Sequence, residues 1–230
     1  DSIGATIVAE TAVPLFAAPG QQSLLRGEAG AFYRSNGNAR TANLAATWAS
    51  SNVSLNYTGA TSQSDNYEAG EAFKTTRETG RPGHTLDLDE VGSSAWETRN
   101  HTLGLAVRNE QHLLHLSFGY QDMPYQLYPN QRMDLLDNEQ ERVNLRYLGE
   151  FGAVAVEARV YRETVDHFMD FGDDKRFWYG TNSGTGTPCS PIRFHGDPAG
   201  TCAAGMPMYT ESETTGALLR ADVTLSPGNL

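Results

Sequence analysis

The amino-acid sequence predicts an all-β fold built as an antiparallel sheet. Apolar and polar residues alternate with a period of two along most of the chain, which is typical of strands with two different faces. No segment has the period of 3.6 residues that an amphipathic helix needs. The 230 residues include 39% hydrophobic side chains and 23 glycines, enough for one or two ordinary domains with many turns.

Seven alternating runs can be followed in order along the chain. In the first, residues 41–48, Ala42, Leu44, Ala46 and Trp48 share one face. Six later runs have the same pattern, at 52–59, 102–108, 114–120, 142–147, 153–161 and 219–225. A further strand is expected before the first connection near residue 35, which brings the predicted total to about eight strands.

The connections between these runs alternate between short and long. Tight turns are predicted near Ser51, Asn109, Glu150 and Pro227. The longer connections are predicted at 35–40, 62–94, 122–140 and 170–214. All tight turns then lie at one end of the strands and all long connections at the other, as in outer-membrane barrels. The sequence therefore predicts an antiparallel transmembrane β-barrel section, with its polar face turned inward.

The charge and the motifs exclude other classes. A formal net charge of -11 argues against a nucleic-acid partner, which needs a basic surface. No nucleophile, phosphate-loop or C-x-x-C motif is present, so we expect no enzyme, no catalytic residue and no catalytic cofactor. Cys189 and Cys202 share one Gly- and Pro-rich segment, where either a disulfide or two free thiols would fit.

The stretch 160–176 contains a candidate metal-binding pair, His167 and Met169. Glu157 and Arg159 mark the odd positions of this run as its polar face, so continued alternation points both candidate ligands into the lumen. At about 3.3 Å per residue, His167 lies about 50 Å along the strand from the turn near Gly152, close to the outer mouth of a barrel.

The other methionines point to the same chemistry. All 5 methionines fall in or beside the predicted long connections: the four besides Met169 are Met123, Met133, Met206 and Met208. Imidazole nitrogen and thioether sulfur suit copper, particularly Cu(I), better than hard cations. The alternative is that these methionines pack as adaptable apolar side chains under the long loops.

At this point the chain resembles TonB-dependent outer-membrane receptors. The opening "DSIGATIVAET" is similar to the last plug strand of that family, and "QLYPNQRMDLLDNEQERVNLRYLGEFG", "HFMDFGDDKR" and "GMPMYTES" are similar to segments of its copper-receptor branch. The resemblance implies a plug-filled barrel of 22 strands in the bacterial outer membrane. Residues 1–20 would end the plug domain, and residues 21–230 would form the N-terminal part of the barrel with long extracellular loops.

The resemblance also implies partners and a transported solute. TonB would act through a plug region expected before Asp1, while lipid and lipopolysaccharide would surround the barrel. In the copper branch a His-x-Met pair on the barrel binds the metal, and that role carries over to His167 and Met169. The hypotheses kept open are a copper receptor, a siderophore or other metal-chelate receptor, a passive or structural barrel, and a soluble β-sandwich binding module.

Overall fold

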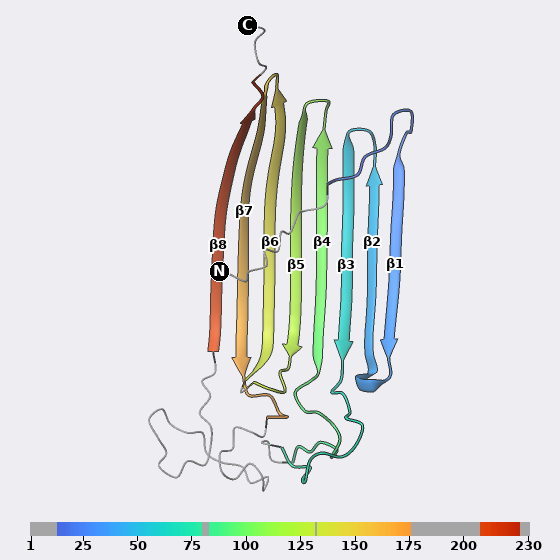
Figure 1. Cartoon of the computed structure of the whole chain (residues 1–230), viewed down its shortest axis with the longest axis vertical. Helices are drawn as coiled ribbons and strands as arrows, with labels where there is room; N and C mark the ends of the chain where they lie inside the picture. Colours follow the sequence, from blue (N-terminus) through green and yellow to red (C-terminus); the bar gives the residue numbers. More distant parts are fainter. Residues whose placement is uncertain (1–12, 80–82, 132, 176–207, 226–230) are drawn as a thin grey trace.

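The computed structural model describes residues 13–79, 83–131, 133–175 and 208–225. These residues form one antiparallel sheet of eight strands, in which each strand pairs with its neighbours in sequence (Figure 1). The strands are β1 (Leu24–Arg34), β2 (Ala39–Ala49), β3 (Val53–Ser64), β4 (Trp96–Arg108), β5 (His112–Gln126), β6 (Asp134–Phe151), β7 (Val154–Asp170) and β8 (Met208–Val223). A short 3₁₀ turn, η1 (Asn36–Asn38), joins β1 to β2. The all-β class and the eight antiparallel strands are confirmed.

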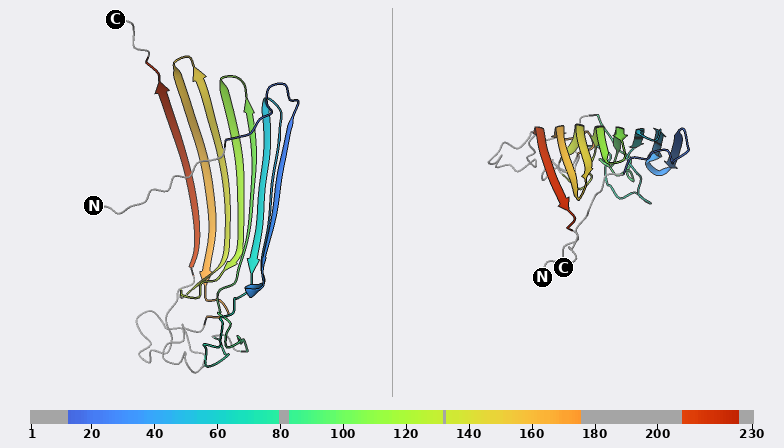
Figure 2. Two further views of the ribbon diagram at one scale, coloured as in Figure 1. Left: turned by 45° about the vertical axis from the view of Figure 1, so that its right-hand side comes forward. Right: turned by 90° about the horizontal axis from the view of Figure 1, so that it is seen from above.

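The two ends of the sheet differ as the connection lengths predict. Tight turns join β2 to β3, β4 to β5 and β6 to β7 at one end, and the 65–95 connection between β3 and β4 lies at the other (Figure 1). Seen along the strands, the sheet is a single layer (Figure 2). In the part of the chain that the structure describes, no helix has the length and apolar character needed to cross a membrane.

Several strands extend further than the alternation predicts. The connection predicted at 122–140 is confined to 127–133, because β5 continues to Gln126 and β6 begins at Asp134. Likewise, β8 begins at Met208, inside the connection predicted at 170–214. Near these strand ends both faces carry polar residues, so the hydrophobic period is lost while the backbone ladder continues. Periodicity therefore marked the apolar part of each strand and missed its polar extension.

The described residues enclose almost no apolar core. Leu103, Leu105 and Leu116 are 48%, 42% and 42% exposed, and they lie side by side on one face of β4 and β5. The buried hydrophobic residues are Ala17, Ala39, Ala49, Leu86, Ala106, Leu135 and Phe171. A soluble sandwich would bury its Leu and Val faces against a second sheet, and no second sheet is present in the described residues. A contiguous exposed apolar face of this kind is typical of a surface in contact with lipid or a partner.

The apolar face forms a band that runs obliquely across the strands. On β2 its outward residues run from Ala42 to Trp48, and on β7 they run from Val154 to Val160. Through the strand pairing, Ala42 lies in one row with Asp166 and Trp48 lies in one row with Val160. Both edges of the band therefore shift by six residues (166 − 160 and 160 − 154) over five strand steps.

This shift gives the tilt of the strands relative to the band. Six residues at about 3.3 Å, over five steps of about 4.8 Å, correspond to an angle of about 40°. Outer-membrane barrels have strand tilts of about 35–45°. The sheet thus has the stagger that strands of a membrane barrel need if their apolar residues are to lie in one horizontal belt.

The segment before β1 is fastened to the turn end of the sheet. The Ala17 amide donates to the Ser50 carbonyl (3.0 Å), and the Arg108 guanidinium lies 3.9 Å from the centre of the Phe16 ring. Arg108 is itself fixed by its Nε–H, which donates to the Ser51 carbonyl (2.9 Å). A cation–π contact and a backbone hydrogen bond therefore anchor residues 16 and 17 beside the β2–β3 turn.

Candidate functional site

β7 carries the His167 and Met169 pair to the loop end of the sheet. Its pairing with β8 has no register shift from Val154 to Met169, so the alternation of faces is unbroken. Glu157 and Arg159 lie on the same face as the pair and bond to polar side chains of β6, where Arg146 Nε lies 2.7 Å from Glu157 Oε1. The pair therefore lies on the polar face of the sheet, opposite the apolar band.

The strand register brings two further methionines to this face. Met208 of β8 lies directly opposite Met169, and Met123 of β5 lies opposite Asn138, which in turn lies opposite His167. Directly opposed residues have Cβ atoms about 4.5–5.5 Å apart and share a face. One imidazole and three thioethers thus lie on one patch of polar face, over β5, β7 and β8. We call these four residues, Met123, His167, Met169 and Met208, the His–Met patch.

The remaining predicted site residues lie elsewhere. Met133 is in the 127–133 connection, just before β6. Met206, Cys189 and Cys202 lie outside the described residues. Prediction placed Met123 in a long loop, but it lies within β5, because that strand extends past the last apolar residue of its alternating run.

The His–Met patch lies well beyond the apolar band. His167 is seven residues past Val160 (167 − 160), where the continuous apolar run on the outward face of β7 ends. At about 3.3 Å per residue and a tilt of about 40°, this places His167 about 18 Å above the edge of the band. Within the described residues, no group of three or more His, Cys, Asp or Glu side chains could hold a metal ion. A metal bound here would therefore rely on thioether sulfur as well as imidazole, a donor set that suits copper.

Asn138 is a neighbour of the patch that the sequence analysis missed. Its Oδ1 lies 3.0 Å from His167 Nδ1, and the residue is only 9% exposed. Asparagine is common on the polar face of such strands, so nothing in the sequence marks this one. Only the register of β6 with β7 places it beside His167.

A buried ion pair fixes the connections next to the patch. Lys175 Nζ lies 2.8 Å from Asp134 Oδ1, and both side chains are 0% exposed. Asp134 also accepts hydrogen bonds from the Tyr128 amide (2.8 Å) and the Ser93 hydroxyl (3.1 Å). Lys175 donates to the carbonyls of Tyr128 and Gln131. These bonds connect Ser93 of the β3–β4 connection with Tyr128, Gln131 and Asp134 and with Lys175 beyond β7, and we call the unit the loop clasp.

Asp174 forms the second half of the loop clasp. It accepts hydrogen bonds from the Ser93 amide (2.8 Å) and Asn66 Nδ2 (2.7 Å), and His84 Nε2 lies 2.7 Å from its Oδ1. Burial raises the pKa of this carboxyl, but the bonds from Ser93, Asn66 and His84 outweigh burial, so the pKa of Asp174 lies below its ordinary value.

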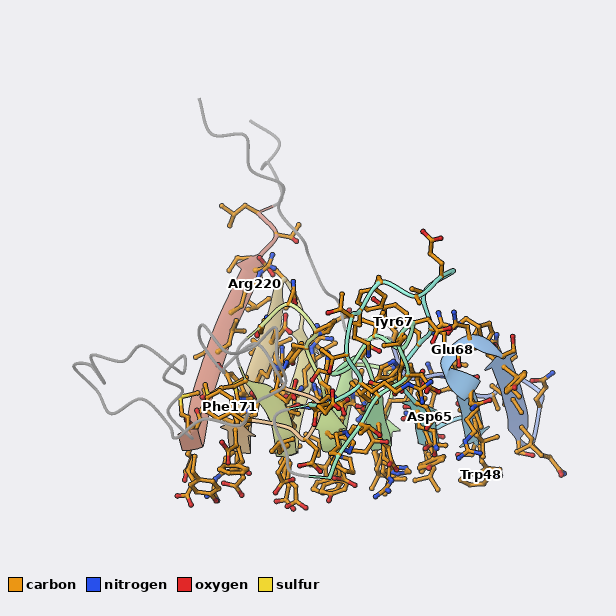
Figure 3. The ribbon with its side chains drawn as sticks, turned by 90° about the horizontal axis from the view of Figure 1, so that it is seen from below. Trp48, Asp65, Tyr67, Glu68, Phe171 and Arg220 are labelled. Carbon is orange, nitrogen blue, oxygen red and sulfur yellow. The ribbon has the colours of Figure 1, made fainter. Side chains whose placement is uncertain are left out.

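The 65–95 connection, which contributes Asn66 and Ser93 to the loop clasp, lies on the same side of the sheet as the His–Met patch. Figure 3 shows Tyr67 and Glu68, from the 65–95 connection, on the side of the sheet opposite Trp48 of the apolar band. Asp134 pairs with Asp170 and Leu135 with Met169, so the clasp begins where β7 carries the patch. The 65–95 connection therefore lies on the polar side, and the clasp adjoins the strand end that carries Met169.

Comparison with known proteins supports the fold. No protein-family model matches the chain, and no curated protein matches it significantly. A similar solved structure is the copper transporter OprC, with 23% sequence identity and a TM-score of 0.57. The match covers 89% of this chain and 26% of that chain, so the chain spans about a quarter of the transporter's length. At this identity the likeness shows a shared fold.

Proposed function

We propose that this chain is part of a TonB-dependent outer-membrane receptor that takes up copper by active transport. In this proposal residues 1–20 end a plug domain, and residues 21–230 begin a 22-stranded barrel whose apolar belt lies in the bacterial outer membrane. The partners are TonB on the periplasmic side and lipid and lipopolysaccharide around the belt. The fold likeness to the copper transporter OprC and the tilt of about 40° support the membrane setting.

The observation that carries the choice of copper is the His–Met patch. Its thioethers and imidazole form a soft donor set, and they are carried on paired strands on the polar face above the apolar band. His167 and Met169 are the proposed ligands, with Met123 and Met208 as the nearest further donors and Met133 and Met206 as candidates along the approach. Copper is here the transported solute.

Copper binding tests this assignment. The copper content of the purified full-length protein is measured by mass spectrometry for the wild type and for His167→Ala combined with Met169→Ala. The matched control changes a histidine outside the patch, His101→Ala. We expect the double patch variant to lose its copper and the control to keep it. Equal copper content in both variants would refute the metal assignment.

The alternative functions give different results in cells. Uptake of copper by an active receptor stops when TonB is deleted, whereas uptake through a passive barrel continues. A siderophore or other metal-chelate receptor would bind the intact chelate and would leave free copper unbound by the purified protein. A strain that lacks TonB and a binding assay with free copper therefore separate the three functions.

A further inference from the structure

The imidazole of His167 has a defined hydrogen-bond partner. Its Nδ1 lies 3.0 Å from Oδ1 of Asn138, the residue directly opposite it on β6. An amide oxygen only accepts hydrogen bonds, so the proton of this bond must belong to Nδ1 of the imidazole. In a neutral imidazole with Nδ1 protonated, Nε2 carries the lone pair that can bind a metal.

We infer that Asn138 is a positioning residue that holds His167 in the tautomer whose Nε2 is open to the transported metal. This inference rests on the proposed function, because it assigns a role to Asn138 through a ligand of the proposed copper site. Partners that orient a metal-binding histidine through its other nitrogen typically change metal affinity by about 10–100-fold when they are removed.

The surroundings of His167 make Asn138 the residue that can fill this role. No other hydrogen bond joins the His167 side chain to a residue in the described part of the chain. On the other flank, β8 places Thr210 opposite His167, and Thr210 is exposed. Asn138, at 9% exposure, is shielded from water that could otherwise compete for Nδ1. Both residues of the bond lie on paired strands, so the sheet holds the two side chains next to each other.

Two substitutions separate positioning from packing. Asn138→Leu keeps the branched shape of the side chain and removes the acceptor, whereas Asn138→Asp keeps an acceptor for Nδ1. If Asn138 positions His167, copper affinity of the full-length protein falls about 10–100-fold in the leucine variant and is retained in the aspartate variant. If Asn138 only fills space, the order reverses, because leucine packs well and a part-buried carboxylate does not. The reverse order would overturn the inference.

The tautomer can be measured without any metal. The full-length protein is labelled with ¹⁵N-histidine, and His167 is identified as the signal missing from His167→Ala. The two tautomers have distinct ¹⁵N shifts at Nδ1 and Nε2. We expect Nδ1–H in the metal-free wild type and in Asn138→Asp, and a mixture of tautomers in Asn138→Leu. An Nε2–H tautomer in the wild type, or an unchanged tautomer in the leucine variant, would refute the role of Asn138.

The two measurements also distinguish this inference from the proposed function. If the His167→Ala and Met169→Ala double variant keeps its copper, the copper assignment is wrong whatever the tautomer. If that variant loses its copper while Asn138→Leu binds copper as the wild type does, the copper assignment holds and the role of Asn138 is wrong.

Discussion

The oblique apolar band makes a prediction that strand pairing alone would not. Leu44 of β2 and Thr164 of β7 lie in one row of the sheet, because the pairings from β2 to β7 connect them. A tilt of about 40° nevertheless places them at different depths. Leu44 lies within the band, between Ala42 and Trp48, whereas Thr164 lies four residues (164 − 160) beyond Val160, about 10 Å above the band at about 3.3 Å per residue.

Arginine substitutions measure this difference in depth. An arginine near the midplane of the bilayer costs about 2–4 kcal/mol of folding free energy, and near the interface about 0–1 kcal/mol. We therefore expect Leu44→Arg to destabilise the full-length protein by about 2–3 kcal/mol more than Thr164→Arg, a factor of about 30–150 in the folding equilibrium. Leu44→Ala and Thr164→Ala serve as controls for the loss of each native side chain.

The assay is urea-dependent unfolding from phospholipid vesicles, followed by tryptophan fluorescence. A larger cost for Leu44→Arg than for Thr164→Arg, after subtraction of the alanine controls, is the expected result. Equal costs at the two positions would mean that depth follows the rows of the sheet, and the tilt argument would then be wrong. A larger cost at Thr164 would refute the membrane setting of the band.

Three further predictions concern the loop clasp and the segment before β1. Lys175→Met leaves the buried carboxylate of Asp134 without its ion-pair partner and should lower the free energy of unfolding by about 3–5 kcal/mol. Adding Asp134→Asn to Lys175→Met should restore most of that free energy, and the urea midpoints of the two variants measure the difference. The pKa of Asp174 lies below its ordinary value of 3.8, so ionised Asp174 stabilises the fold above pH 3.8, and this stabilisation is lost as the pH falls through the lower folded pKa. In that acidic range, amide hydrogen exchange in the β3–β4 connection should accelerate in the wild type and not in Asp174→Asn. Arg108→Ala should expose the anchored segment, so a cysteine introduced at Ala17, which is 2% exposed, should react with a thiol reagent much faster than the same cysteine in a protein that keeps Arg108. An unchanged rate would mean that the hydrogen bond to Ser50 alone holds the segment.

The apolar parts of the strands could be predicted from the sequence, and their polar extensions could not. In runs such as Ala42 to Trp48, the two faces of the strand meet different environments, so apolar and polar side chains alternate with a period of two residues. Beyond the band polar residues stand on both faces, so the period of two is lost while the backbone hydrogen bonds of the ladder continue. Met123 was therefore placed in a loop although β5 continues to Gln126.

The part of the candidate site that depends on the alternation of faces along β7 could be predicted from the sequence. Continued alternation correctly placed His167 and Met169 on the polar face, because β7 contains no register shift against β8. The neighbours of the pair depend on register between strands that are distant in sequence, such as Met208 opposite Met169. No local pattern encodes that register, and so the part played by Asn138 could not be seen from the sequence.

The long polar extensions of the strands affect how this protein can evolve. The His–Met patch is carried by strands that are hydrogen-bonded to their neighbours, and the chain beyond their ends contributes none of its four residues. Insertions and deletions in the connections can therefore change the loop end of the sheet while the spacing of the four side chains stays the same. Related proteins should accordingly differ most in the length of these connections and least in the register of β5 to β8.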